Sequence, residues 1–231
     1  AKLTIAVVSN PNSGKSTIFN RLTGLRQKTG NYPGVTVERH TGTLSVDQTA
    51  IDLIDLPGTF ALSANSLEER IAVGVVLGRM AGTPRPEGIL AVVSATHLYQ
   101  GLYLLQQLME LDLPIVVALT MVDAAEASGV RIDIEALERH LGGIRVCPVV
   151  GTTGKGMDVL MRALADIESL APPSLPEFWP QLSAAAVEAV FREYADESGI
   201  KLRQVMAPVR LALTGRHAGE QFNALINRAT G

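Results

Sequence analysis

The sequence has almost no cysteine, few aromatic residues and no long hydrophobic run. Its single cysteine, Cys147, rules out an intramolecular disulfide and fits a reducing compartment. No apolar stretch approaches the ~18–20 residues that a membrane-spanning helix needs. The four histidines are scattered without metal-ligand spacing, so a structural zinc site is not expected. What remains is the pattern of a globular chain built around an apolar core.

The chain also lacks an excess of positive charge. Lys and Arg number 20 against 23 Asp and Glu, which gives a net charge of −3. Proteins that bind nucleic acid by neutralising phosphates usually carry a basic patch or stripe. We therefore expect no nucleic-acid partner. Hydrophobic residues make up 47% of the 231 residues, which is enough for a sizeable core.

Short β-branched runs alternate with helical patterns along residues 1–170, which is typical of parallel βαβ units. Buried strands are predicted at residues 3–8, 89–93, 115–119 and 145–149, and a hairpin at residues 43–46 and 50–54. The predicted fold class is therefore α/β, with a mostly parallel sheet flanked by helices.

A proline-rich stretch at residues 171–176 is typical of a linker. Strand patterns disappear after it, and apolar residues recur at helical spacing. We predict one domain over residues 1–170 and a small all-helical subdomain over residues 171–231. Acidic and basic residues are balanced in that tail, which favours a docking or regulatory role over RNA binding.

A phosphate-binding motif follows the first predicted strand. Residues 9–16 are Ser-Asn-Pro-Asn-Ser-Gly-Lys-Ser, the spacing of a Walker A loop, with Ser9 at the usual first glycine. Such a loop directs backbone N–H groups at a phosphate at a helix N-terminus. Lys15 would reach the β- and γ-phosphate oxygens, and the Ser16 hydroxyl would ligate Mg²⁺.

A second motif, Asp55-Leu56-Pro57-Gly58, follows the strand predicted at residues 51–54. Asp55 can hold Mg²⁺ through water, and the Gly58 N–H can meet a γ-phosphate. Residues 30–39, between the two motifs, are rich in Gly and Pro and should be mobile. Thr36 within them is placed to close on Mg²⁺ and the γ-phosphate, which is a known mode of switching.

The motifs at residues 10–17, 30–38 and 55–59 closely resemble those of the N-terminal intracellular domain of FeoB, the bacterial ferrous iron transporter. The likeness covers roughly residues 1–170. It implies a Ras-like P-loop GTPase domain, followed by a GDI-like helical subdomain, at the cytoplasmic face of the bacterial inner membrane. The implied partners are guanine nucleotide and a C-terminal membrane permease domain, and self-association is compatible with it.

The resemblance also implies GTP or GDP, Mg²⁺ and K⁺ as cofactors, with slow, K⁺-stimulated GTP hydrolysis. Catalysis would involve Lys15, Thr36, Gly58 and Asn12. The residues that would bind nucleotide are Asn10, Pro11, Asn12, Ser13, Gly14, Lys15, Ser16, Thr17, Gly34, Val35, Thr36, Asp55, Gly58, Thr120, Asp123, Gly151 and Thr152. The implied Mg²⁺ ligands are Ser16, Thr36 and Asp55, and the implied K⁺ ligands are Asn12, Gly30 and Tyr32.

The base-recognition motifs depart from the family pattern. Thr120-Met121-Val122-Asp123 stands at the Asn-x-x-Asp box, and Gly151-Thr152 stands where Ser-Ala or Ser-Thr is usual. Asp123 can still accept from guanine N1–H and N2–H₂, and the Thr152 N–H can reach O6. Thr120, however, is expected to be too short to tie the base loops together, and Gly151 has no hydroxyl. Losing one or two such hydrogen bonds costs roughly 1–3 kcal/mol, which predicts weakened guanine affinity.

Three functions remain open from the sequence. The first is a GTP-hydrolysing switch that gates ferrous iron uptake. The second is a weak- or non-binding regulatory scaffold that acts through protein contacts. The third is an RNA-associated assembly GTPase, which would be expected to carry a basic appendage that residues 171–231 do not supply.

Overall fold

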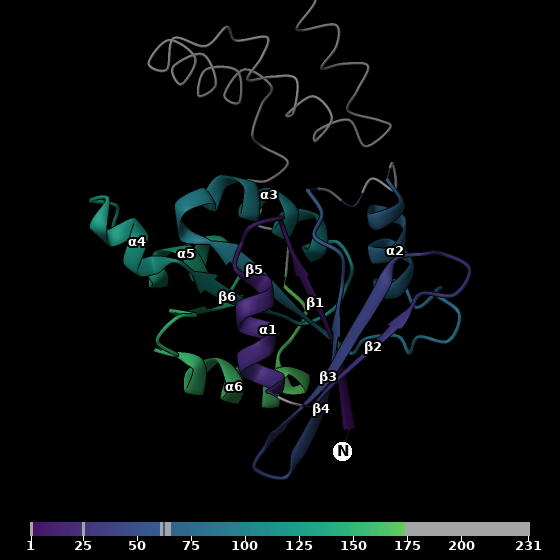
Figure 1. The fold of residues 1–231 in the computed structure, drawn as a ribbon. Coiled ribbons are helices and arrows are strands. Elements are labelled where there is room, and N and C mark those ends of the chain that lie inside the picture. The colour runs from purple at the N-terminus through teal and green to yellow at the C-terminus, as the bar shows by residue number, and fades with distance from the viewer. Residues whose placement is uncertain (1, 25, 61, 63–65, 174–231) are drawn as a thin grey trace, which may run out of the picture. The chain divides into compact units, whose positions relative to one another are not determined.

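The structure is a computed structural model that describes residues 2–24, 26–60, 62 and 66–173 (Figure 1). The chain divides into one unit of residues 1–175 and another of residues 176–231. The helical subdomain predicted for residues 171–231 lies outside the described residues, apart from its first three.

The first unit is built on a seven-stranded sheet with the strand order β2-β3-β4-β1-β5-β6-β7. Five strands run parallel: β1 (Lys2–Ser9), β4 (Thr49–Asp55), β5 (Gly88–Ser94), β6 (Ile115–Thr120) and β7 (Arg145–Pro148). β3 (Glu38–Val46) pairs antiparallel with β4, and β2 (Gln27–Asn31) pairs antiparallel with β3. The predicted α/β class with a mostly parallel sheet is confirmed.

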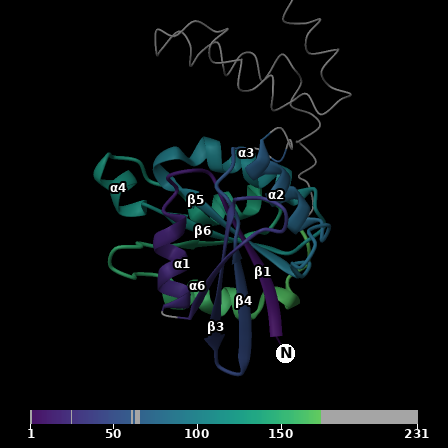
Figure 2. The ribbon, with the colours of Figure 1, turned by 45° about the vertical axis from the view of Figure 1, so that its right-hand side comes forward.

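Helices cover both faces of this sheet (Figures 1 and 2). α1 (Lys15–Thr23) and α6 (Met157–Ala165) pack on one face. The other face carries α2 (Leu67–Val76), α3 (Leu98–Met109), α4 (Val122–Ala127) and α5 (Ile134–His140). Every residue of β5 and β6 is buried as a result, which explains their continuous apolar sequences. No helix among the described residues is long and apolar enough to cross a membrane.

The edge of the sheet differs from the prediction. Residues 27–31, which overlap the start of the segment predicted to be mobile, form β2, and β3 begins at Glu38 rather than at residue 43. The register runs from Gln27 opposite Gly42 to Asn31 opposite Glu38. All five residues of β2 are exposed, so this strand has no apolar alternation to reveal it.

The topology brings the predicted motifs to one edge of the sheet. β1 ends at Ser9, β4 at Asp55 and β6 at Thr120, and all three strands run in the same direction. The central strand β1 lies between β4 and β5, so the connections on its two sides leave in opposite directions along the sheet. In open α/β sheets, ligands bind beyond the carboxyl ends of the strands at such a point.

Candidate functional site

The loop from β1 to α1 wraps a cavity of about 450 Å³, which is lined by residues 9–17 and Gly58. Asn12 (φ 61°) and Gly14 (φ 83°) both take the left-handed conformation, which Asn and Gly tolerate best. Residues that alternate between the left-handed and right-handed conformations turn successive backbone N–H groups toward an anion. α1 begins at Lys15, with no side-chain cap and no acidic residue in its first turn. Its positive end therefore faces the cavity.

Lys15 and Asp55, which lie 40 residues apart in the chain, meet beside this loop. The Lys15 Nζ is 2.5 Å from Asp55 Oδ1 and also donates to the Leu56 carbonyl. Both side chains are largely buried, with 13% and 14% of their surface exposed. The lysine predicted to bind phosphate and the carboxylate predicted to hold Mg²⁺ thus form one ion pair.

The turn after β4 rests on the phosphate loop. The Thr59 N–H donates to the Ser9 carbonyl (2.9 Å), and the Asn10 Nδ2 donates to the Thr59 carbonyl (3.1 Å). A Cβ on Gly58 would lie 3.4 Å from Pro11 Cα, so the two backbones are in contact. The sequence assigned Asn10 only to the nucleotide. Its bond to Thr59 was missed because the partner is a backbone atom 49 residues away.

The segment that carries Thr36 lies over a separate cavity of about 680 Å³, lined by residues 31–36 and Leu67. Tyr32 anchors this segment, because its side chain is only 1% exposed and its hydroxyl lies 3.4 Å from the Asp55 carbonyl. Burial, together with the nearby Asp55 carboxylate, raises the pKa of the Tyr32 hydroxyl. The hydroxyl therefore remains a neutral donor at physiological pH.

Two predicted ligand sets are not brought together in this arrangement. Thr36 does not line the cavity that contains Ser16. Asn12 lines the phosphate cavity, whereas Gly30 pairs with Arg39 in the sheet and Tyr32 lines the second cavity. The Tyr32 carbonyl, a predicted K⁺ ligand, accepts from the Val35 N–H at 3.2 Å. Both sets are therefore incomplete in this arrangement.

Thr120, which is predicted to be too short to tie the base loops together, reaches the phosphate loop. Its Oγ1 donates to the Ser13 carbonyl at 2.6 Å and lies 3.2 Å from the Val93 carbonyl. The short side chain suffices because β6 ends directly beside the loop. Thr120 is only 3% exposed, so this link is shielded from water.

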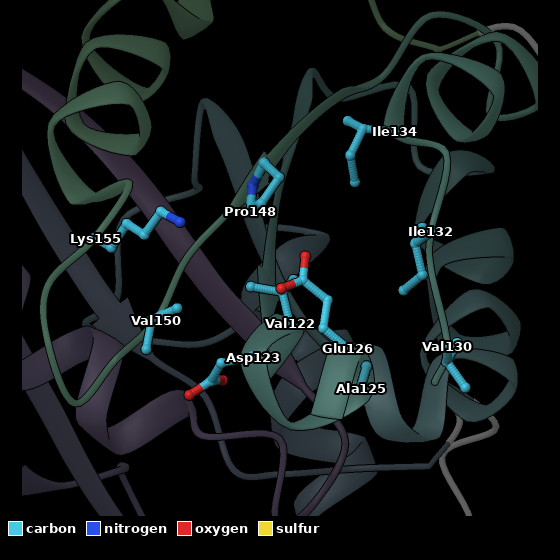
Figure 3. A pocket seen from close by; sticks show the side chains of 10 residues that line it. All are labelled: Val122, Asp123, Ala125, Glu126, Val130, Ile132, Ile134, Pro148, Val150 and Lys155. Carbon is cyan, nitrogen blue, oxygen red and sulfur yellow. The ribbon is translucent and has the colours of Figure 1, made fainter. Parts of the chain in front are cut away.

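Asp123 lies in the first turn of α4, at the edge of a cavity of about 170 Å³ (Figure 3). The figure shows its carboxylate beside Val150, with Lys155 and Glu126 on other walls of the cavity. Gly151 and Thr152 follow Val150 in the loop after β7. Arg21 of α1 donates to the carbonyls of both residues, which no sequence motif indicated.

The residues present fit a nucleotide phosphate and a divalent cation. Among the described residues, the Ser9 and Ser13 hydroxyls are buried without a hydrogen-bond partner, which is a costly arrangement in a finished core. The loop offers N–H donors, a helix N-terminus and the Lys15 ammonium, all of which suit an anion. The oxygens of Ser16 and Asp55 suit Mg²⁺.

A mostly parallel sheet, a Walker A loop after its central strand and an Asp-x-x-Gly turn beside that loop define a P-loop GTPase fold. The family model described as "Ferrous iron transport protein B" matches residues 3–164. The chain belongs to this family. A second family model, described as "Anticodon binding domain", matches residues 154–227, which is less than half of the chain.

Curated and solved relatives agree with this family. The Fe(2+) transporter FeoB of Escherichia coli K12 is 46% identical over 167 residues, covering 71% of this chain and 21% of that protein. The chain therefore spans about a fifth of the length of the curated relatives it matches. The cytosolic domain of L. pneumophila FeoB has a TM-score of 0.71 and 33% identity, covering 97% of this chain and 88% of its own. The cytosolic domain of T. maritima FeoB in its GMPPNP form has a TM-score of 0.73 and 26% identity, covering 98% and 93%.

Proposed function

We propose that this chain is the guanine-nucleotide switch of a ferrous iron transport protein and that it hydrolyses GTP slowly. The observation that carries the proposal is the meeting of Lys15 and Asp55 at 2.5 Å beside the phosphate loop. Related FeoB domains have been solved in GDP and GMPPNP forms, which supports guanine nucleotide as the ligand. The matched residues cover only 21% of the length of the curated relative, which supports a membrane permease domain as the partner at the cytoplasmic face of the inner membrane.

In this proposal each residue has a defined task. Lys15 leaves Asp55 and neutralises charge on the β- and γ-phosphates, while the loop N–H groups and the α1 terminus hold the β-phosphate. Ser16, Asp55 and Thr36 would hold Mg²⁺, which when bound neutralises charge that develops during phosphoryl transfer. Gly58 offers its N–H to the γ-phosphate. Thr36 joins the site when residues 30–37 move.

Slow hydrolysis follows from what stands after Gly58. The next residues are Thr59 and Phe60, so this turn places no glutamine to orient the attacking water and no arginine to stabilise charge. Asn12 on the loop offers a neutral oxygen that suits a large monovalent cation. We therefore expect faster turnover in KCl than in NaCl. Equal rates in both salts, or an Asn12→Ala variant with an unchanged K⁺ response, would count against this part of the proposal.

The base site supports retained guanine preference with lowered affinity. Asp123 keeps its carboxylate, whereas Gly151 supplies no hydroxyl to orient it. The second function, a scaffold with little nucleotide binding, would leave Lys15 on Asp55 permanently. The chain's net charge of −3 supports the absence of a nucleic-acid partner, despite the partial match to an anticodon binding domain.

The deciding experiment is calorimetric titration of GDP and GMPPNP with Mg²⁺ into the parent, Lys15→Ala and Lys28→Ala. Lys28 is exposed on β2 and serves as the charge-matched control. A charge-assisted contact of this kind contributes ~1.5–3 kcal/mol, so Lys15→Ala should bind about 10- to 100-fold more weakly. A parent that binds neither nucleotide favours the scaffold. Unchanged binding by Lys15→Ala refutes the phosphate site.

A further inference from the structure

Arg21, on the helix that follows the phosphate loop, forms hydrogen bonds to the loop that would face the base. Its Nε donates to the Gly151 carbonyl and its Nη2 donates to the Thr152 carbonyl. Arg21 and this loop are 130 residues apart in the chain. One guanidinium thus links α1 to two successive peptide groups of the loop after β7.

The loop packs closely enough on α1 for this grip to be specific. A Cβ on Gly151 would lie 3.0 Å from Thr17 Cγ2, and one on Gly154 would lie 2.9 Å from Arg21 Nη1. Gly154 also has φ +84°, a conformation that L side chains rarely adopt. A larger residue at position 151 would press on Thr17, and one at position 154 would be strained by the backbone conformation.

The far end of the loop is closed by its own backbone. The Val150 N–H donates to the Lys155 carbonyl (3.0 Å), and the Gly154 N–H donates to the Val150 carbonyl (2.8 Å). These bonds fix where the loop begins and ends. They do not fix the orientation of the peptide planes at residues 151–153. The Arg21 guanidinium binds two carbonyls in this part of the loop.

Peptide geometry converts this grip into an orientation of the recognition donor. In a planar trans peptide, the carbonyl of one residue and the N–H of the next point in opposite directions. Arg21 holds the Gly151 carbonyl toward α1, so the Thr152 N–H must point away from α1. That N–H is the donor expected to meet the oxygen at position 6 of the base.

We propose that Arg21 is a positioning residue for base recognition, which selects purines with a carbonyl at position 6 over 6-aminopurines. The inference rests on the proposed function. Arg21 orients the Thr152 N–H through the backbone, whereas the hydroxyl that position 151 lacks would have oriented Asp123. It acts on the base loop and leaves the phosphate contacts unchanged.

A lysine cannot replace this arginine. The planar guanidinium binds two carbonyls in a fixed fork, whereas an ammonium is a single point charge. Arg21→Lys therefore keeps the positive charge near the site and removes the two-point grip. This variant separates the proposed role from simple attraction of the nucleotide phosphates.

The test compares Arg21→Lys and Arg21→Ala with Arg26→Lys and Arg26→Ala. Arg26 is an exposed arginine whose guanidinium contacts Ser45 on β3 at 3.3 Å, away from the base loop. Dissociation constants for GDP, IDP and ADP are measured at constant ionic strength. Loss of two exposed hydrogen bonds should weaken GDP and IDP roughly 5- to 20-fold in Arg21→Lys. ADP binding and the Arg26 variants should not change.

Hydrogen exchange without nucleotide supplies an independent measurement. The amides of residues 152–154 should exchange faster in Arg21→Lys than in the parent. Unchanged exchange there, or an equal loss of GDP and ADP affinity in Arg21→Lys, overturns the proposal while leaving the proposed function intact. A parent without any guanine-nucleotide binding overturns both.

Discussion

Replacing Thr120 by valine should weaken the link between β6 and the phosphate loop while preserving the shape of the side chain. The Thr120 hydroxyl donates to the Ser13 carbonyl at 2.6 Å, and the Val93 carbonyl lies farther away at 3.2 Å. One proton serves both acceptors, so the shorter bond to Ser13 carries most of the interaction. Valine removes the donor and leaves the Ser13 carbonyl without it.

The size of the effect follows from burial. Thr120 and Ser13 are each only 3% exposed, so water cannot readily replace the lost donor. An unsatisfied buried carbonyl costs about 1–3 kcal/mol. For a chain of this size that cost corresponds to a fall in melting temperature of about 2–10 °C. Ser13 is part of the phosphate loop, so part of this cost should also appear in nucleotide binding. Each 1.4 kcal/mol of the cost that falls on the loop would weaken the binding of both GDP and GMPPNP about tenfold.

The assay is thermal unfolding together with calorimetric titration of both nucleotides. Thr120→Ser keeps the hydroxyl and should behave like the parent. Thr43→Val is the matched control, because the Thr43 hydroxyl bonds the Asp52 carboxylate at 3.0 Å within the β3–β4 pair. That variant should leave nucleotide binding unchanged. If Thr120→Val melts and binds like the parent, or if Thr120→Ser fails as valine does, the link has no energetic weight.

Three further expectations concern other parts of the domain. Hydrogen exchange at residues 26–38 should slow with GMPPNP and Mg²⁺, mainly at residues 32–37 because β2 is already paired; identical exchange in both states would contradict the switch. Gly151→Ser alone should lower the melting temperature and gain little GDP affinity, because a Cβ at position 151 would lie only 3.0 Å from Thr17 Cγ2. Adding Thr17→Ser should relieve this clash, so equal melting temperatures of the single and double variants would refute the reasoning. Burial raises the pKa of the Cys147 thiol to about 11, so between pH 9 and 11 the unfolded chain loses this proton first. The free energy of unfolding should therefore fall by about 2–3 kcal/mol as the pH rises through this range, and Cys147→Ala should flatten that slope in denaturant titrations.

The central strands were predictable because burial on both faces leaves a clear record in the sequence. β5 and β6 are buried along their whole length, and the predicted apolar residues 89–93 and 115–119 fall within them. The sequence of β2 shows no apolar pattern, because an exposed edge strand can consist of polar residues on both faces. Its pairing is satisfied by backbone groups, which every residue carries.

The same distinction applies to the site. Lys15 and Asp55 were predictable as neighbours because both belong to motifs whose spacing reflects phosphate and metal chemistry. The contacts of Thr120 and Arg21 were not, because each of these side chains bonds a main-chain carbonyl. A carbonyl has no residue identity, so the sequence cannot indicate which one a donor will reach. Only the packing of β6 and α1 against the loops determines those partners.

In the proposed function, the ion pair between Lys15 and Asp55 makes the binding of nucleotide and of Mg²⁺ depend on each other. While the Lys15 ammonium remains on Asp55, a magnesium ion must compete with a positive charge for the same carboxylate. A phosphate draws the ammonium away and so frees the carboxylate for the metal. By thermodynamic reciprocity, the metal then raises nucleotide affinity by the same factor by which nucleotide raises metal affinity. In the proposed function, the domain therefore binds free magnesium weakly and takes up nucleotide and metal together.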